Sequence, residues 1–411
     1  MNTYTIEGQT LNSIELKCLL VSLGVQVDSA VYKRFGDAYR LNIDPLTCNC
    51  VILSDGVIAQ MTDTRFHLRY LSGILSWENL KLLRYASELG TPFTIKLQED
   101  KAVLFHKRAF VDVVTFPPHS AFYEQRTTSG VPFAGNSVLQ GLDWVAFQCL
   151  WPCEYAAAGK PCQYCFSGAA FQSLAERGKP QPNALAPADV AEIVSWAIEN
   201  TSANSIQITG GSTFSGVNEA EHIRSYLSVI REKVAVEQLD EILLYITPPS
   251  DRALIDAYFA LGASRIACSL EVWDTGLAKE ITPGKTEFTT RERYMRILSY
   301  IATEYGPGKA FSNFIIGLEP FESLAAGARH LAERGIVPTA PVWMPMGRPV
   351  RGSMKAPGLD YYRRVIALYA ELYDKYKLEP PGGRGLHVCV DRDIWRHMSD
   401  IPGGHKDRGD G

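Results

Sequence analysis

The sequence lacks the charge patterns that mark several classes of protein. Its 411 residues carry a formal net charge of only −4 at pH 7, without long runs of like charge. Lys and Arg occur singly or in pairs such as Lys107-Arg108 and Arg363-Arg364, whereas nucleic-acid binding requires clustered basic residues to contact phosphates. No repeat of solenoid type is present. We therefore expect no nucleic-acid partner.

Long apolar segments are also missing. No apolar stretch approaches the roughly 18 residues that a membrane-spanning helix needs. The N-terminus, Met-Asn-Thr-Tyr-Thr-Ile-Glu, has no basic segment followed by an apolar run, so it does not resemble a secretory signal. We expect no membrane partner and a cytoplasmic location. Thiols stay reduced in the cytoplasm, so the nine cysteines are expected to be metal ligands, catalytic groups or small buried hydrophobes rather than disulfides.

The pattern from about residue 140 onward predicts an α/β fold. Short apolar runs alternate there with segments of helical periodicity, as in parallel sheets with crossover helices. The expected strands are Trp144 to Leu150, Ser205 to Thr209, Glu241 to Thr247, Arg265 to Leu270, Ala310 to Ile316 and Thr339 to Met344. The expected helices are Ala188 to Asn200, Glu219 to Val234, Thr290 to Thr303 and Leu324 to Arg334. Six such strands predict a partial (β/α)6 barrel of the TIM type, with its chemistry at the C-terminal ends of the strands.

The first 135 residues do not show this alternation. They predict a small N-terminal α/β accessory domain over residues 1–135, followed by the barrel over 136–380 and an irregular C-terminal tail over 381–411. The expected N-terminal helices are Ser13 to Leu23 and Ser76 to Leu89, and the expected strands are Asn49 to Leu53, Thr94 to Leu97, Ala102 to Phe105 and Val111 to Thr115.

Cys153, Cys162 and Cys165 follow the first predicted barrel strand in a C-x8-C-x2-C spacing. Three thiolates can hold three irons of a cubane cluster and leave the fourth iron open to an exogenous ligand. The last pair reads Cys-Gln-Tyr-Cys, which places Tyr164 just before the final ligand. Cys149 is an alternative first ligand, but its position inside an apolar run favours a buried structural thiol. The spacing therefore predicts a [4Fe-4S] cluster.

The alternative for these cysteines is a structural zinc site. Structural zinc sites close with four ligands, usually as two C-x2-C pairs or as C-x2-C with two histidines. The chain has no second C-x2-C, although Cys48 and Cys50 could complete a site from the N-terminal region. In that case the protein would be a non-catalytic, zinc- or Fe-S-stapled interaction protein.

The cysteine motif resembles that of the radical SAM superfamily, whose usual form is C-x3-C-x2-C with an aromatic residue at the same place as Tyr164. The first spacing departs from that form. After the second strand, Gly210-Gly211-Ser212 resembles the Gly-Gly-Glu-like turn that binds the amino group of S-adenosylmethionine (SAM) in this family, with Ser212 replacing the acid. Glycines in such a turn let the backbone approach a ligand closely.

Later segments resemble the biotin synthase-like branch of the superfamily. The resemblance implies that Glu271 contacts the SAM ammonium or ribose, although this residue could instead cap the next helix. It implies that Ile315 or Ile316 packs against adenine and that Gly317 lets the turn pass close to it. Arg348, after the last strand, would clamp a carboxylate of substrate or SAM, or form a surface ion pair.

The resemblance implies an enzyme that cleaves SAM reductively at a [4Fe-4S] cluster. The resulting 5′-deoxyadenosyl radical would abstract hydrogen from a small-molecule substrate, with a one-electron donor such as flavodoxin or ferredoxin. Neither the substrate nor catalytic residues can be read from the sequence. After residue 165 only Cys268 and Cys389 remain, so no auxiliary cluster is expected. Tyr245 and Trp273 near strand ends would line the pocket or fill the core.

Overall fold

A computed structural model describes most of the chain. The described residues are 1–35, 49–61, 91–118, 120–134, 136–140, 143–149, 153–165, 178, 184–235, 237, 239–344, 356–382 and 388–401. Within these ranges no helix combines the length and the apolar character needed to cross a membrane.

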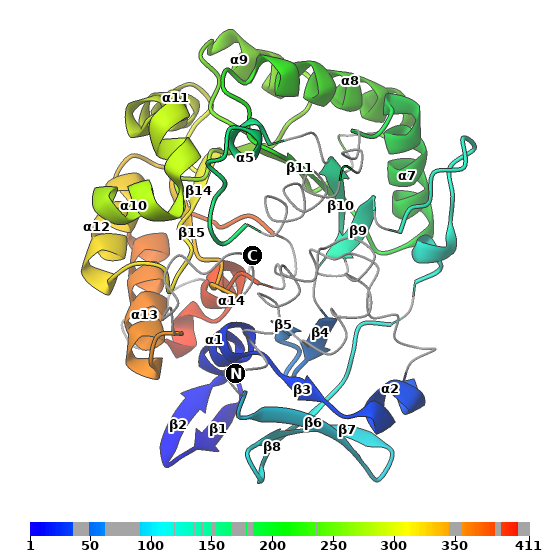
Figure 1. The fold of residues 1–411 in the computed structure, drawn as a ribbon, viewed down its shortest axis with the longest axis vertical. Coiled ribbons are helices and arrows are strands. Elements are labelled where there is room, and N and C mark those ends of the chain that lie inside the picture. Colours follow the sequence, from blue (N-terminus) through cyan, green and yellow to red (C-terminus); the bar gives the residue numbers. More distant parts are fainter. Residues whose placement is uncertain are drawn as a thin grey trace.

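A seven-stranded sheet forms the centre of the molecule (Figure 1). Its strands are β9 (Ser137–Gln140), β10 (Trp144–Cys149), β11 (Ser205–Gly210), β12 (Glu241–Tyr245), β13 (Arg265–Ala267), β14 (Ala310–Asn313) and β15 (Val337–Thr339). Strands β10 to β15 are parallel and lie side by side in sequence order, while β9 pairs antiparallel with β10. The predicted α/β fold and its six parallel strands are confirmed.

Helices form an arc around the outside of these strands (Figure 1). They are α7 (Pro187–Asn200), α8 (Val217–Lys233), α9 (Ala253–Ala260), α10 (Thr275–Ile281), α11 (Arg291–Glu304), α12 (Phe321–Ala332) and α13 (Leu359–Lys375). The short helix α5 (Glu154–Ala157) follows β10, and the π-helical turn η3 (Lys285–Thr289) follows α10. Helix α7 illustrates why these segments form helices and pack against the sheet. Pro187 occupies a first-turn position, and Val190, Ile193, Val194 and Ala197 form one buried stripe. A one-sided apolar stripe of this kind packs the helix onto the sheet.

Several strands are shorter than predicted, because regular pairing stops before the apolar runs end. Beyond β13 and β14 the chain continues through isolated bridges, which join Glu271 to Phe314 and Ile316 to Val342. The last strand, β15, lies upstream of the predicted range. Pro341 in that range has no N–H to donate, which interrupts a regular ladder.

The N-terminal region contains a separate four-stranded sheet in the order β3-β6-β7-β8 and two hairpins (Figure 1). Its elements are β1 (Thr3–Ile6), β2 (Gln9–Asn12), α1 (Ser13–Leu23), β3 (Gln26–Val27), α2 (Ser29–Phe35), β4 (Asn49–Ile52), β5 (Ile58–Met61), β6 (Phe93–Gln98), β7 (Lys101–His106), β8 (Ala109–Val114) and η1 (Ala121–Glu124). Helix α1 has the predicted bounds. The helix predicted over Ser76 to Leu89 lies outside the described residues.

Helix α1 contributes to two hydrophobic cores. Ile14, Cys18 and Val21 belong to the large core around the parallel strands. Leu16 and Leu20, on the other side of the helix, belong to the core of the N-terminal region. The accessory-domain boundary near residue 135 stays a prediction, but this helix ties the two regions together by packing.

The C-terminal tail differs from the irregular segment expected there. Residues 388–390 lie beside the end of β15, where Val342 N–H donates to the carbonyl of Val388 at 2.9 Å and Val390 N–H donates to that of Ala340 at 3.2 Å. The short helices α14 (Asp391–Arg396) and η4 (Met398–Asp400) follow, and Ile394 and Ile401 are buried. The glycines around residue 382 suggested disorder, but these apolar side chains and free strand-edge groups hold the segment in place.

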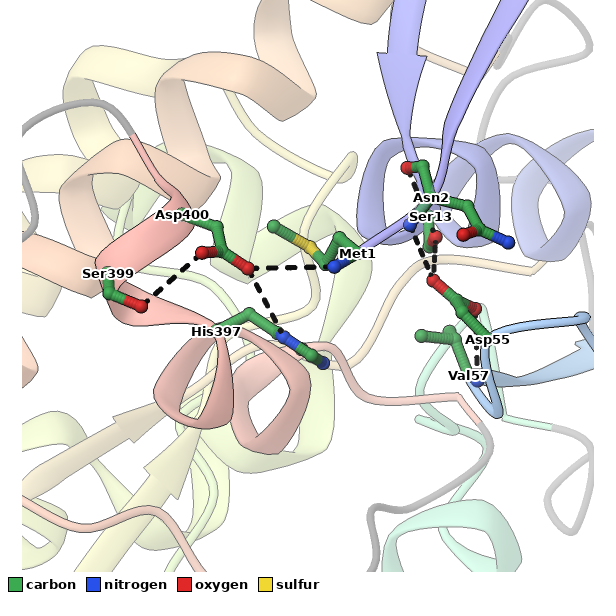
Figure 2. Close-up of polar contacts among 8 residues, drawn as sticks. All are labelled: Met1, Asn2, Ser13, Asp55, Val57, His397, Ser399 and Asp400. Atoms are coloured by element: carbon green, nitrogen blue, oxygen red, sulfur yellow. Dashed lines mark hydrogen bonds and ion pairs between the residues drawn. The ribbon is translucent and has the colours of Figure 1, made fainter. Parts of the chain in front are cut away.

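The two ends of the described chain meet near this segment (Figure 2). The amino group of Met1 lies 3.6 Å from an Asp400 carboxylate oxygen, and His397 Nδ1 lies at the same distance from that oxygen. On the other side, Asp55 accepts a hydrogen bond from the N–H of Asn2 at 2.9 Å and another from the Ser13 hydroxyl. These contacts fix the first residues between the C-terminal segment and the β4-β5 hairpin.

Candidate active site

The cysteine segment lies at the C-terminal ends of the parallel strands. Cys153 is the N-cap residue of α5, and Cys162 and Cys165 follow in the same loop. The N–H of Glu154 donates to the carbonyl of Ser212 at 2.8 Å, which anchors this loop to the turn after β11. The N–H of Gln163 donates to the carbonyl of Ile281 at 2.9 Å, which anchors it to the end of α10. Two strand-end loops thus hold the cysteines in position.

A third anchor comes from the Pro-Gly turn after α10. A Cβ at Gly284 would lie 2.5 Å from the Cβ of Tyr155 and 2.7 Å from the carbonyl oxygen of Lys160. Only glycine allows this approach without a shift. Nearby, the Tyr155 hydroxyl bonds Thr289, and its ring packs with Phe288 at a centroid distance of 5.7 Å. The loop is therefore packed closely against η3.

Tyr164 and Lys285 lie near Glu271 beside the cysteines. Burial and the nearby Glu271 charge raise the pKa of Tyr164 well above its usual value. Glu271 in turn accepts from Lys285 Nζ at 2.8 Å, and the same ammonium donates to the carbonyl of Ser269 at 2.6 Å. Burial lowers the pKa of Lys285, but Glu271 outweighs that effect and the pKa is raised, so the lysine is a cation.

This pairing changes the role expected of Glu271. The side chain of Asp274, not that of Glu271, caps α10, accepting from the N–H groups of Gly276 and Leu277 at 2.8 Å. Glu271 instead faces the cavity described below, with φ at +70°. The helix-cap alternative is therefore wrong, and the SAM-contact role stays a prediction.

The three cysteine thiols lie close enough to influence one another. Burial raises the pKa of the Cys162 thiol, and Cys165 and Cys153 raise it further, while Lys285 lowers it. Among the described residues, no three His, Cys, Asp or Glu side chains converge as ligands of a single metal ion. In a cubane each cysteine binds a different iron, so the thiols need not converge on one point. The backbone of Cys149 pairs with Gly210 in the sheet.

A cavity of about 320 Å³ opens between the strand ends next to this loop. Its wall includes the predicted residues Gly210, Gly211, Ser212 and Glu271. Tyr245, which was predicted to line the pocket or fill the core, also lines it. The remaining lining residues were not singled out for this site: Gln207, Thr209, Glu219, Ile246, Thr247, Ser269, Lys285, Tyr294, Asn313, Pro341, Val388 and Cys389. The structure thus brings the Gly-Gly turn, Glu271 and Lys285 to one space.

Glu219 is the most unusual of the unforeseen residues. It lies in the first turn of α8 with 2% of its surface exposed, and its carboxylate accepts from the N–H of Thr247 at 3.2 Å and the hydroxyl of Thr213 at 3.4 Å. Burial raises its pKa to about 8. An acid in the first helical turn after a Gly-rich loop was the available sequence signal, but it is common at helix starts.

The predicted adenine-contacting residues are divided between two environments. Ile315 packs in a small cluster with Tyr164 and Trp343, on the side of the cysteine loop. Ile316 is fully buried in the large core. Gly317 has φ at +107°, and its N–H donates to the Tyr361 hydroxyl at 3.1 Å. Of the two isoleucines, Ile315 is thus the one on the cysteine side.

Two further predictions concern the strand ends. Trp273 packs on Gly327, where a Cβ would lie 2.7 Å from the ring, and under Arg291, whose guanidinium lies 4.4 Å from the ring centroid. Its role is therefore packing. Arg348 lies outside the described residues.

We compared the chain with known proteins. No protein-family model matches it. A curated relative, bacteriochlorophyllide c C-7(1)-hydroxylase from Chlorobaculum limnaeum, is 25% identical in an alignment of 272 positions that covers 61% of this chain. The match covers 65% of the relative's own length, which is less than two thirds. The comparisons support the superfamily resemblance of the cysteine motif.

The solved structures that resemble this chain are more distant. Coproporphyrinogen III oxidase from Escherichia coli has a TM-score of 0.34 at 17% identity and covers 46% of this chain and 44% of its own. HydG, a maturase of the [FeFe]-hydrogenase, has a TM-score of 0.40 at 14% identity and covers 56% and 54%. Elp3 from the archaeon Methanocaldococcus infernus has a TM-score of 0.35 at 12% identity and covers 64% of each chain. All three scores lie below 0.5.

Proposed function

We propose that this protein binds a [4Fe-4S] cluster through Cys153, Cys162 and Cys165 and cleaves SAM reductively, generating a 5′-deoxyadenosyl radical that abstracts hydrogen from a small-molecule substrate. The observation that carries the proposal is the place of the cysteine loop, which is hydrogen-bonded to the Gly-Gly-Ser turn, and that turn lines a polar cavity at the strand ends. Parallel α/β folds bind their ligands at this end of the strands.

The donor set fits such a cluster. Three cysteines that form no disulfide come from one short loop, which hydrogen bonds to Ser212 and Ile281 hold in place. The cluster, when bound, supplies the electron that cleaves SAM. Lys285, a buried cation near Cys162, offsets the negative charge that thiolate ligands bring into the protein.

The cavity walls supply groups for the polar parts of SAM. Glu271 is anchored by Lys285, so its carboxylate is held in one position toward a ligand cation. The carbonyl of Ser212 accepts the Glu154 N–H, and Ser212 also lines the cavity, where its hydroxyl would contact the SAM amino group. Ile315 offers an apolar face next to Tyr164. These residues bind and orient, while the surrounding fold excludes water.

The relative acts on a bacteriochlorophyllide, according to its name. Bacteriochlorophyllide c is therefore the first substrate to test. Its addition should raise the rate of 5′-deoxyadenosine formation above the rate with SAM alone, if this chain shares that substrate class. A flavodoxin or ferredoxin would supply the electron in the cell.

The decisive experiment is anaerobic reconstitution with iron and sulfide, followed by dithionite and SAM, with 5′-deoxyadenosine and methionine quantified by chromatography. Equimolar formation of the two products is the expected result. If a cluster assembles but SAM stays intact, that result contradicts the proposed cleavage of SAM. The missing acid at Ser212 and the long first cysteine spacing would then explain it. Stoichiometric zinc without any iron cluster would instead favour the stapled interaction protein.

A further inference from the structure

The cavity contains a buried amide whose oxygen has no partner. Gln207, in the middle of β11, has 8% of its surface exposed and lines the cavity. Its Oε1 atom is buried and makes no hydrogen bond to any part of the chain that the structure describes. Buried polar atoms are nearly always hydrogen-bonded, and an unmet acceptor destabilises the fold.

The register of the sheet explains why the fold cannot satisfy this oxygen. Gln207 pairs with Ala146 on β10 and with Leu243 on β12. In-register residues on parallel strands point to the same face, so the side chains beside Gln207 are apolar and carry no donor. The polar lining residues Thr209 and Ser269 lie nearer the strand ends. A hydrogen-bond donor for Gln207 must therefore come from the space of the cavity.

The position of Gln207 also separates it from the cysteine side of the cavity. It precedes Gly211 by four residues, which in a β-strand corresponds to about 13 Å. The Gly-Gly turn lies beside the cysteine loop, through the bond between Ser212 and Glu154. Gln207 therefore lies at the floor of the cavity, and a molecule that reaches it extends inward from the turn.

We propose that Gln207 is a specificity-determining residue for the substrate, and that its amide oxygen accepts a hydrogen bond from a hydroxyl or N–H group on the inward end of a small polar molecule. This inference rests on the proposed function, because it takes the cavity as the place where the substrate loses hydrogen. The inference limits the substrate class to molecules that carry a hydrogen-bond donor on the end that reaches Gln207. Molecules whose inserted end is purely apolar are excluded.

A pair of small probes tests this preference on the full, reconstituted protein. Perdeuterated propane-1,2-diol carries two hydroxyl donors, whereas perdeuterated tetrahydrofuran is of similar size and carries only an acceptor. With dithionite and SAM, a C–D bond of the probe breaks as a C–D bond forms at C5′ of deoxyadenosine. Dithionite then reduces the probe radical by one electron, and water supplies a proton. Mass spectrometry of 5′-deoxyadenosine measures the deuterium.

The expected result is saturable deuterium transfer from the diol and at least tenfold less transfer from tetrahydrofuran in the wild-type protein. Gln207→Met, which keeps the volume and removes the acceptor, should lower transfer from the diol about tenfold or more and leave the KM for SAM within about twofold. Gln60→Met, which removes a buried glutamine from β5 in the N-terminal region, is the matched control and should change neither quantity.

Three outcomes would overturn the inference: equal transfer from both probes, no transfer from either while SAM is cleaved, or a large rise in the KM for SAM in Gln207→Met. If the wild-type protein makes no 5′-deoxyadenosine, the proposed function fails. Thermal unfolding without ligand then shows whether the amide oxygen of Gln207 lacks a partner within the fold. An unchanged or higher Tm in Gln207→Met supports an unmet acceptor. A Tm several degrees lower shows that the amide is bonded within the fold and refutes the inference.

Discussion

Gly284 lies so close to Tyr155 that a Cβ at position 284 would stand 2.5 Å from the tyrosine Cβ. The same Cβ would lie 2.7 Å from the carbonyl oxygen of Lys160, inside the loop that carries the cysteines. The turn after α10 and the cysteine loop are therefore fitted to each other without spare volume. Adding one methyl group at this contact should therefore shift the cysteine loop at the proposed cluster site.

Gly284→Ala should displace the cysteine loop and cost about 1–3 kcal/mol of stability, the range for overpacking a tight interior contact. We expect less iron per chain after reconstitution and slower SAM cleavage. Gly358→Ala is the matched control, because a Cβ there meets nothing within 4 Å, and it should retain full iron content. Iron and sulfide assays together with thermal unfolding measure both effects. Equal iron content in the two variants would contradict the proposed tight fit.

Lys17 and Asp393 join helix α1 to the C-terminal helix α14 by a buried ion pair. Lys17 Nζ lies 2.7 Å from Asp393 Oδ2, and the two side chains are 1% and 7% exposed. Lys17→Met should destabilise the protein by about 3–5 kcal/mol, because it leaves the carboxylate buried without its cation. Adding Asp393→Leu should recover most of that loss. Denaturant unfolding of the single and double variants measures the difference.

The control for that pair is Arg34, which lies 3.2 Å from Asp100; the two side chains are 52% and 78% exposed. Arg34→Ala should cost only about 0–1 kcal/mol, as exposed ion pairs do. If Lys17→Met costs no more than Arg34→Ala, the C-terminal segment does not depend on the Lys17–Asp393 contact for its position.

The strands and most helices could be predicted because their apolar residues repeat with the period of the element, as in α7. The C-terminal segment was missed for the opposite reason. Val388 and Val390 follow a Gly-rich stretch, and their alternation is too short to predict a strand. Their backbone is held by hydrogen bonds to the edge of the sheet beyond β15. Gln207 is another such case. Its isolation depends on the apolar residues that the sheet register places beside it, and the linear sequence does not contain that register.

The cysteine ligands could be predicted from the sequence, but the contacts that hold the site in position could not. The spacing of the cysteines and the residue Tyr164 are readable from the sequence. The pairing of Glu271 with Lys285 crosses 14 residues of sequence and depends on how η3 folds back on the strand end. The bond between the Glu154 N–H and the Ser212 carbonyl likewise joins loops that follow different strands. Such contacts come from tertiary structure, which local pattern does not encode.

Glu219 should make stability depend on pH. Burial raises its pKa from 4.5 to about 8 in the folded protein, so the folded state binds a proton that the unfolded state releases above about pH 4.5. Its contribution to stability is therefore complete below pH 4.5, declines as the pH rises and is lost above about pH 8. Between pH 6 and pH 8 the loss should be on the order of 2 kcal/mol. Glu219→Gln keeps an acceptor for the Thr247 N–H and should lack this dependence.

Denaturant unfolding of the wild-type protein and Glu219→Gln at pH 6 and pH 8 tests this prediction. The variant should gain relative stability as the pH rises. A constant difference between the two proteins would mean that the Glu219 carboxyl titrates near its usual pKa. Glu221→Gln, in the same helix but exposed, is the matched control and should show the pH dependence of the wild-type protein.

Cys162→Ala should abolish cluster assembly while the barrel stays folded. Cys162 lies in a loop, not in a strand or in the large core, so the loss of its thiol removes a ligand and little packing. We expect iron content and 5′-deoxyadenosine formation to fall to background, with a circular dichroism spectrum like that of the wild-type protein. Cys149→Ala is the contrasting variant, because its residue stands within β10. It should keep the cluster, and loss of iron in Cys149→Ala together with normal iron in Cys153→Ala would identify Cys149 as the first ligand.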